Sequence, residues 1–239
     1  GKRKMSGKST YFFFLGVGGI GMSALARYFR HKGFTVAGYD RTRTELTDTL
    51  EKEGIEIFFE DNIDPIPLCF LDKINCRVIY TPAIPKNSIL FNYFLDNGYL
   101  LQKRSEILGS ISKNHQTIAV AGTHGKTTIS TMIAHLLHSS GLKINALLGG
   151  ISHNFNSNVY LDDEAKILVT EADEYDRSFL QLHPDIAVIT SVDADHLDIY
   201  GVEEQILDSY KEFAQQISDP GFLISTKEVI KKLQTKKNS

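Results

Sequence analysis

The chain of 239 residues has no tryptophan, two cysteines and six prolines. Cys69 and Cys76 form neither a C-x-x-C pair nor another metal-binding spacing, which excludes a disulfide framework and a structural zinc site. Such sparing use of cysteine fits a reducing cytosol, so we expect a cytoplasmic protein. No hydrophobic run approaches the length of a membrane span, and membrane insertion is therefore not expected.

An excess of charge of one sign is also missing. The 26 Lys and Arg residues nearly balance the 29 Asp and Glu residues, with a formal net charge of −3, so nucleic acid is not an expected partner. Basic residues in 227–237 recur at helical spacing, which favours a solvated face or tail. The basic residues 2–4 and apolar residues 11–15 imitate a signal peptide. Because the apolar run is short and ends in a glycine turn, we interpret it as a buried first strand.

The central motif of the chain is IAVAGTHGKTT, residues 118–128. An apolar strand runs into a glycine-bearing turn and then into a predicted helix, an arrangement whose amides and helix dipole suit a polyphosphate. Lys126 can reach terminal phosphates, and the Thr127 hydroxyl is placed to coordinate Mg²⁺. The motif is shorter than a standard P-loop, and the alternative is an ordinary strand–turn–helix junction. The predicted ATP-binding residues are Gly122, Thr123, His124, Gly125, Lys126, Thr127 and Thr128.

A second glycine loop lies near the N-terminus. After the strand 11–15, residues 16–21 match G-x-G-x-x-G, a helix is predicted over 22–32, and a second strand over 34–39 ends in Asp40. This βαβ pattern predicts a diphosphate in the loop and a ribose contact at Asp40. NAD is the default ligand for such a loop, and a UDP-sugar is the alternative.

Acidic residues follow two further apolar strands. Residues 171–178, EADEYDRS, come after the strand 167–170, where carboxylates beside a phosphate loop are suited to hold Mg²⁺. Residues 191–198, SVDADHLD, come after the strand 185–190 and place His196 among three aspartates. A solvated acidic turn and a structural histidine are the alternatives.

These motifs together resemble the Mur ligases of peptidoglycan synthesis. The similar segments are GTHGKTT, EADE, DADHLD, GVGGIGMSALA, RVIYTPAI and LLQKRSEIL. The resemblance favours a UDP-sugar over NAD and implies that Gly16, Gly18, Gly19, Gly21, Asp40 and Thr81 bind it. It also implies that Thr127 and Glu171 hold Mg²⁺ and that His196 contacts a second Mg²⁺, with Asp195 orienting the histidine.

The function that the resemblance implies is an ATP- and Mg²⁺-dependent ligase of cell-wall synthesis, on which cell shape and division depend. It would join L-alanine to UDP-N-acetylmuramate through an acyl phosphate, with Lys126, Glu171 and His196 as catalytic residues. Three alternatives stay open: a ligase that attaches a whole tripeptide to the same UDP-sugar, a non-catalytic nucleotide-binding module, and an NAD-dependent dehydrogenase. The family's central domain continues and a third domain follows, so we expect this chain alone not to ligate.

Apolar strands alternate with amphipathic helices throughout, which predicts an α/β fold with mainly parallel sheets. We expect a Rossmann-like UDP-sugar-binding domain at 1–106 and an incomplete P-loop-type ATP-binding domain at 107–239. Within them we predict a helix over 41–53, a compact polar hinge at 112–116 and a polar loop at 152–158.

Overall fold

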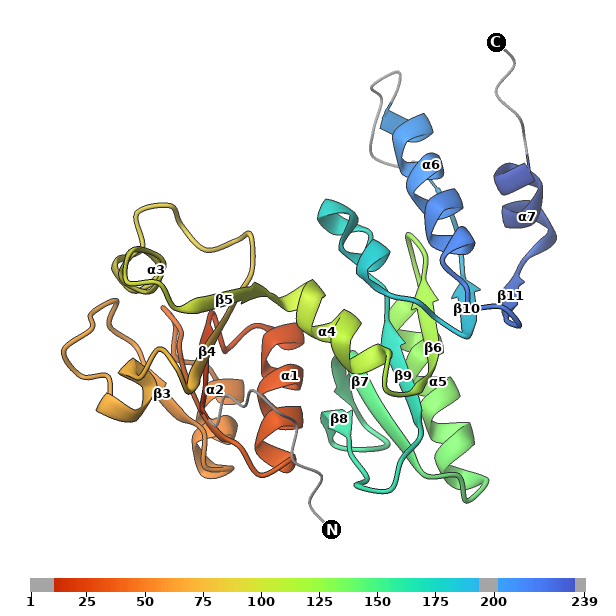
Figure 1. Ribbon diagram of the computed structural model, residues 1–239. Helices are drawn as coiled ribbons and strands as arrows, with labels where there is room; N and C mark the ends of the chain where they lie inside the picture. The colour runs from red at the N-terminus through yellow and green to blue at the C-terminus, as the bar shows by residue number, and fades with distance from the viewer. Residues whose placement is uncertain (1–10, 194–201, 235–239) are drawn as a thin grey trace. The chain divides into compact units, whose positions relative to one another are not determined.

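The computed structural model describes residues 11–193 and 202–234 (Figure 1). The chain divides into two compact units, one ending at Ile107 and the other beginning at Leu108. Each is an α/β unit built on one mainly parallel sheet, as the alternation of strands and helices predicts. No helix among the described residues combines the length and the apolar character needed to cross a membrane.

The first unit is a parallel five-stranded sheet in the order β3-β2-β1-β4-β5. This order places the first βα turn next to the point where the chain reverses direction across the sheet, as in dinucleotide-binding folds. Its elements are β1 (Tyr11–Leu15), α1 (Ile20–His31), β2 (Thr35–Tyr39), α2 (Glu45–Lys52), β3 (Glu56–Phe58), the 3₁₀ helix η1 (Leu68–Leu71), β4 (Cys76–Tyr80), α3 (Ile89–Asp96), β5 (Leu100–Lys103) and the start of α4 (Arg104–Ser112).

Strand β1 lies in the middle of this sheet because its side chains are apolar on both faces. Phe13 packs on one face with Phe70 and Phe94 at ring-centroid distances of 5.9 and 5.5 Å. On the opposite face the Phe12 ring stacks 4.0 Å from that of Phe29 in α1. Only a strand covered on both sides tolerates such a run of phenylalanines.

Helix α2 is shorter than the helix predicted over 41–53. It begins at Glu45 because Thr44 caps it: the Thr44 hydroxyl accepts from the Thr47 amide at 3.2 Å, and the Thr47 hydroxyl accepts from the Thr44 amide at 2.8 Å. This reciprocal capping fixes the start of the helix after Thr44.

The second unit is a six-stranded sheet in the order β11-β10-β6-β9-β7-β8, parallel except where β7 pairs with β8. It contains β6 (Gln116–Ala121), α5 (Lys126–Ser139), β7 (Ile144–Ser152), β8 (Ser157–Tyr160), β9 (Ile167–Glu171), the 3₁₀ helix η2 (Tyr175–Gln181), β10 (Ile186–Ile189), α6 (Val202–Gln215), β11 (Phe222–Ser225) and α7 (Lys227–Gln234).

Two of the segments predicted for this unit are more ordered than a polar loop or hinge alone. The segment 152–158 is not simply a polar loop, because Ser152 ends β7 and Ser157 begins the antiparallel strand β8. At the predicted hinge 112–116, residues 113–115 form the turn between α4 and β6. Ser112 ends α4 with 1% of its surface exposed, and its carbonyl accepts a 2.8 Å hydrogen bond from the Thr117 hydroxyl. The polar residues of β8 are satisfied by pairing with β7, and the corner at Ser112 is fixed by the Thr117 hydroxyl.

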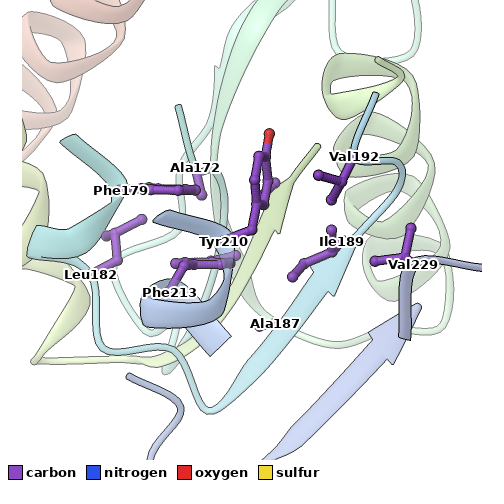
Figure 2. Close-up of a cluster of buried hydrophobic side chains, with 11 residues drawn as sticks. Ala172, Phe179, Leu182, Ala187, Ile189, Val192, Tyr210, Phe213 and Val229 are labelled. Carbon is purple, nitrogen blue, oxygen red and sulfur yellow. The ribbon is translucent and has the colours of Figure 1, made fainter. Parts of the chain in front are cut away.

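The second unit contains a cluster of buried hydrophobic side chains (Figure 2). The Phe179 and Phe213 rings stack 4.8 Å apart, and the Tyr210 ring meets Phe179 edge-on at 5.3 Å. Val229 of α7 belongs to the same cluster, so the basic residues of α7 sit on a docked helix. The cluster connects α6, η2 and the strands that carry the acidic and glycine loops.

Candidate active site

The second glycine loop leaves the end of β6, a central strand of its sheet, and leads into α5. Gly122 has φ +143° and Gly125, the residue that precedes the helix, has φ +81°. A Cβ on Gly122 would overlap the Thr190 hydroxyl oxygen. The turn therefore needs glycine at this position for two reasons, the backbone conformation and the close approach of the end of β10.

The loop is bound to the segment that follows β10. The Thr123 amide donates to the Ser191 carbonyl at 3.0 Å, and the His124 amide donates to the Ser191 hydroxyl at 3.1 Å. The Thr123 hydroxyl accepts from the Asp193 amide at 3.1 Å. The amides of Thr123 and His124 are thus engaged here, whereas helix geometry leaves the first amides of α5 without intrahelical acceptors. Those α5 amides are the ones best placed to meet a phosphate.

Lys126 lies at the first position of α5, with its ammonium group directed back across the loop. Its Nζ donates to the Gly122 carbonyl at 2.7 Å and forms an ion pair with Glu174 Oε2 at 3.1 Å. The two charged side chains are 20% and 30% exposed. The sequence analysis did not single out Glu174, although it is the fourth residue of the EADE motif.

Thr127 and Glu171 come together across neighbouring elements. The Thr127 hydroxyl donates to Glu171 Oε1 at 2.9 Å, while Glu171 Oε2 is buried and has no hydrogen-bond partner among the described residues. Burial raises the pKa of the Glu171 carboxyl, and hydrogen bonds from the Thr127 hydroxyl and the Gly149 backbone, together with the Lys126 charge, partly offset that rise. A hydroxyl beside an unsatisfied carboxylate oxygen is a donor set that fits Mg²⁺.

Gly149, near the end of β7, leaves room for the Glu171 carboxylate. A Cβ on Gly149 would overlap the Glu171 carboxyl group. The structure therefore brings together Lys126, Thr127 and Glu171, three of the residues predicted to act on nucleotide and metal.

The predicted second-metal residue His196 lies outside the described residues, as do Asp195 and Asp198. Within the described ranges no group of three or more His, Cys, Asp or Glu side chains is arranged to hold a metal ion. Asp193, at the start of that motif, pairs with Lys232 of α7 at 3.4 Å. The role of His196 stays a prediction.

The first glycine loop is held against the end of β2. The Gly16 and Val17 amides donate to the Tyr39 carbonyl at 2.7 and 3.0 Å, and the Gly18 amide donates to Asp40 Oδ2 at 2.8 Å. A Cβ on Gly18 would lie 2.7 Å from the same oxygen. Gly18 is thus required by the closeness of Asp40, and the carboxylate predicted to contact a ribose already organises the loop.

Arg104 is a residue of this loop region that the sequence analysis missed. A Cβ on Gly21, near the start of α1, would lie 2.7 Å from Arg104 Nη1. This puts a guanidinium group over the helix N-terminus, where a diphosphate would bind. Its signal was the segment LLQKRSEIL, which the sequence analysis gave only as one of the segments of the resemblance. Thr81 lies in the turn after β4, where its carbonyl accepts from the Ile84 amide at 3.1 Å.

Each of the two mainly parallel sheets carries a glycine loop at the carboxyl end of a central strand, an arrangement typical of nucleotide-binding α/β folds. Residues 12–116 match the model of the Mur ligase family catalytic domain, and residues 120–239 match that of the Mur ligase middle domain. The chain belongs to the Mur ligase family.

Two curated relatives are named UDP-N-acetylmuramate–L-alanine ligase. The protein of Porphyromonas gingivalis is 50% identical over 212 residues, which cover 89% of this chain and 46% of the relative. That of Flavobacterium johnsoniae is 51% identical over 217 residues, covering 91% of this chain and 48% of the relative. The chain thus spans about half the length of the curated relatives it matches.

Solved structures show the same fold. The UDP-N-acetylmuramate-alanine ligase of Thermotoga maritima superposes with a TM-score of 0.79 at 27% identity, covering 91% of this chain and 49% of that one. A UDP-N-acetylmuramate:tripeptide ligase of Neisseria meningitides gives 0.81 at 24% identity, covering 93% of this chain and 74% of that one. At that identity the second comparison concerns the fold alone.

Proposed function

We propose that this chain supplies the UDP-sugar site and part of the ATP site of a cytoplasmic ligase that joins L-alanine to UDP-N-acetylmuramate. The observation that most supports this proposal is the meeting of Lys126, Thr127 and Glu171 at the carboxyl ends of the central strands β6 and β9. The Thr127 hydroxyl and the Glu171 carboxylate are joined there by a 2.9 Å hydrogen bond. Half of the aligned residues are identical to those of curated L-alanine-adding ligases, which favours that branch.

A carboxylate is a poor acyl donor at neutral pH because oxide would have to leave. Phosphorylation by ATP gives an acyl phosphate, which the amine of L-alanine attacks with phosphate as the leaving group. Lys126 would hold the terminal phosphates, and Thr127 and Glu171 would hold Mg²⁺, whose charge stabilises the phosphoryl group in transfer. His196 would contact a second Mg²⁺ near the acceptor carboxylate.

The UDP-sugar would bind at the first loop. Its diphosphate would meet the amides at the start of α1 beside Gly16, Gly18, Gly19 and Gly21, with Arg104 as an additional cation. Asp40 and Thr81 would contact the rest of the nucleotide. Calorimetry of the chain with UDP-N-acetylmuramate and with NAD tests this assignment: we expect binding of the UDP-sugar, and NAD binding of equal strength would overturn it.

The activity itself is tested in a chimaera. This chain replaces the matching 46% of the Porphyromonas gingivalis relative, and phosphate release from ATP and UDP-N-acetylmuramate is measured with L-alanine or with the tripeptide L-Ala-γ-D-Glu-meso-diaminopimelate. We expect L-alanine-dependent release that Lys126→Ala abolishes. Release that depends on the tripeptide instead would assign the chain to the recycling branch. A folded chimaera inactive with both would overturn the proposal.

A further inference from the structure

The lysine of the phosphate loop is already engaged with two acceptors. Lys126 Nζ contacts the Gly122 carbonyl at 2.7 Å and the Glu174 carboxylate at 3.1 and 3.3 Å. If Lys126 reaches terminal phosphates, as proposed above, it has to leave both acceptors. A partly buried carboxylate and a buried carbonyl would then lose their donor, which is costly unless another group replaces it.

A donor that could replace it lies in the adjacent core. The Tyr210 side chain is fully buried, and its hydroxyl has no hydrogen-bond partner among the described residues. Tyr210 packs in one cluster with Ala121 and Ala172, the chain neighbours of Gly122 and Asp173. Figure 2 shows its ring beside Ala172, with the hydroxyl directed out of the cluster and away from Phe213.

The charge of Glu174, which accepts hydrogen bonds from Lys126, also acts on the Tyr210 hydroxyl. Burial raises the pKa of Tyr210, the negative charges of Glu174 and Asp173 raise it further, and the Gly122 amide lowers it. The phenol is therefore protonated at neutral pH and lies within electrostatic reach of the Glu174 carboxylate. Among the described residues this buried O–H has no acceptor, and Ala172, which packs in the same cluster, precedes Glu174 by two positions.

We propose that Tyr210 is a positioning residue that replaces Lys126 as the hydrogen-bond donor to Glu174 when the lysine moves onto the phosphates. In the arrangement seen here, Lys126 satisfies the carboxylate, and the hydroxyl has no partner within residues 11–193 and 202–234. In the second arrangement the hydroxyl is paired and the ammonium group is free to bind phosphate. The exchange lowers the cost of releasing the lysine. The second arrangement rests on the proposed nucleotide binding, whereas the exchange itself can be tested without nucleotide.

The stability test removes the lysine by substitution. Tyr210→Phe, Lys126→Met and the double variant are unfolded in urea. In the wild-type background we expect Tyr210→Phe to leave the unfolding constant unchanged or to lower it, because the lost hydroxyl had no partner. In the Lys126→Met background it should raise the constant about fivefold, because the hydroxyl has then paired with Glu174. Equal effects in both backgrounds would overturn the proposal. Tyr28→Phe, which removes the hydroxyl of a largely buried tyrosine in the first unit, should show no such difference.

The binding test uses Mg²⁺ and a non-hydrolysable ATP analogue. Tyr210→Phe should weaken binding about fivefold without lowering the melting temperature of the free protein, and Glu174→Gln should strengthen binding by freeing Lys126. Tyr210→Phe with unchanged affinity would refute the exchange. Failure of the wild-type chain to bind the analogue at millimolar concentration would count against the proposed function, and the stability test would still decide on the exchange.

Discussion

Glu171 illustrates how one residue can be poorly satisfied in the protein and yet suited to a ligand. Its Oε2 is buried and has no hydrogen-bond partner in the part of the chain that the structure describes, and burial raises the pKa of the carboxyl. In a purely structural role such a buried carboxylate would only lower the stability of the protein. Beside a hydroxyl and a phosphate loop, the same free lone pairs are what a hard cation requires.

This predicts an unusual effect of Glu171→Gln. Because the folded-state pKa is raised, the contribution of the carboxyl to stability is complete below its unfolded-state pKa and is lost as the pH rises through the folded value. The variant should therefore be at least as stable as the wild type at pH 7.5, with the difference shrinking toward pH 4. Urea denaturation across this range measures the effect, and Glu56→Gln at an exposed position of β3 is the control. A clearly less stable variant at pH 7.5 would contradict it. With Mg²⁺ and nucleotide, the variant should bind more weakly.

Gly122 allows a second prediction because Gly141 is a matched control. Both glycines have positive φ, but a Cβ on Gly122 would overlap the Thr190 hydroxyl, whereas one on Gly141 would meet nothing within 4 Å. Gly141→Ala should cost about 1–2 kcal/mol through backbone strain alone. Gly122→Ala should cost at least about 1 kcal/mol more, measured by urea denaturation. Partial rescue of Gly122→Ala by Thr190→Ala would identify the overlap as the cause, and equal costs at the two glycines would exclude it.

The residues of the phosphate loop could be predicted from sequence because glycine, lysine and threonine occur there in a fixed order. Glu174 and Arg104 could not be singled out in the same way. Each acts through a contact made in three dimensions, Glu174 with Lys126 and Arg104 beside Gly21. A charged residue in a polar stretch shows no periodicity that separates it from a solvated neighbour.

At the scale of elements, apolar strands were predictable and polar ones were not. The strand 11–15 was predicted with the bounds that the structure has. Strand β8, Ser157–Tyr160, was missed because its sequence SNVY lacks an apolar run, and pairing with β7 decides its conformation. The start of α2 was misplaced because the sequence analysis did not identify Thr44 as the capping residue.

Helix α6 supplies a prediction at this scale. It docks on η2 through the Phe179–Phe213 stack, and Phe213 is fully buried. Phe213→Ala should destabilise the second unit by about 3–5 kcal/mol, since it removes a ring and leaves a cavity. Phe222→Ala on β11, where the side chain is 68% exposed, should cost less than about 1 kcal/mol. Urea denaturation compares the two variants, and similar losses would mean that α6 is not held by this cluster.

At the scale of the whole molecule, both units present a glycine loop at the carboxyl end of a central parallel strand. In each, the loop is held by the next strand in the sheet: Asp40 binds Gly18 in the first unit, and Ser191 binds Thr123 and His124 in the second. The sheet order therefore determines which residues meet at each loop. That order was not readable from local sequence, because it depends on which strands pair.

The last prediction is that this chain by itself binds UDP-N-acetylmuramate but does not ligate. The first unit has a complete five-stranded sheet with its glycine loop and Arg104, so its ligand should bind without the rest of a ligase. The related ligases contain about as much chain again beyond the matched part. Holding the amine against an acyl phosphate can contribute about 7–11 kcal/mol to catalysis, and exclusion of water protects the intermediate. Positioning the amine and excluding water both require protein groups on more than one side of the site. The measurement is L-alanine-dependent phosphate release by the chain alone, with a full-length relative as the positive control. Turnover close to that of the relative would show that these two units already contain the catalytic machinery.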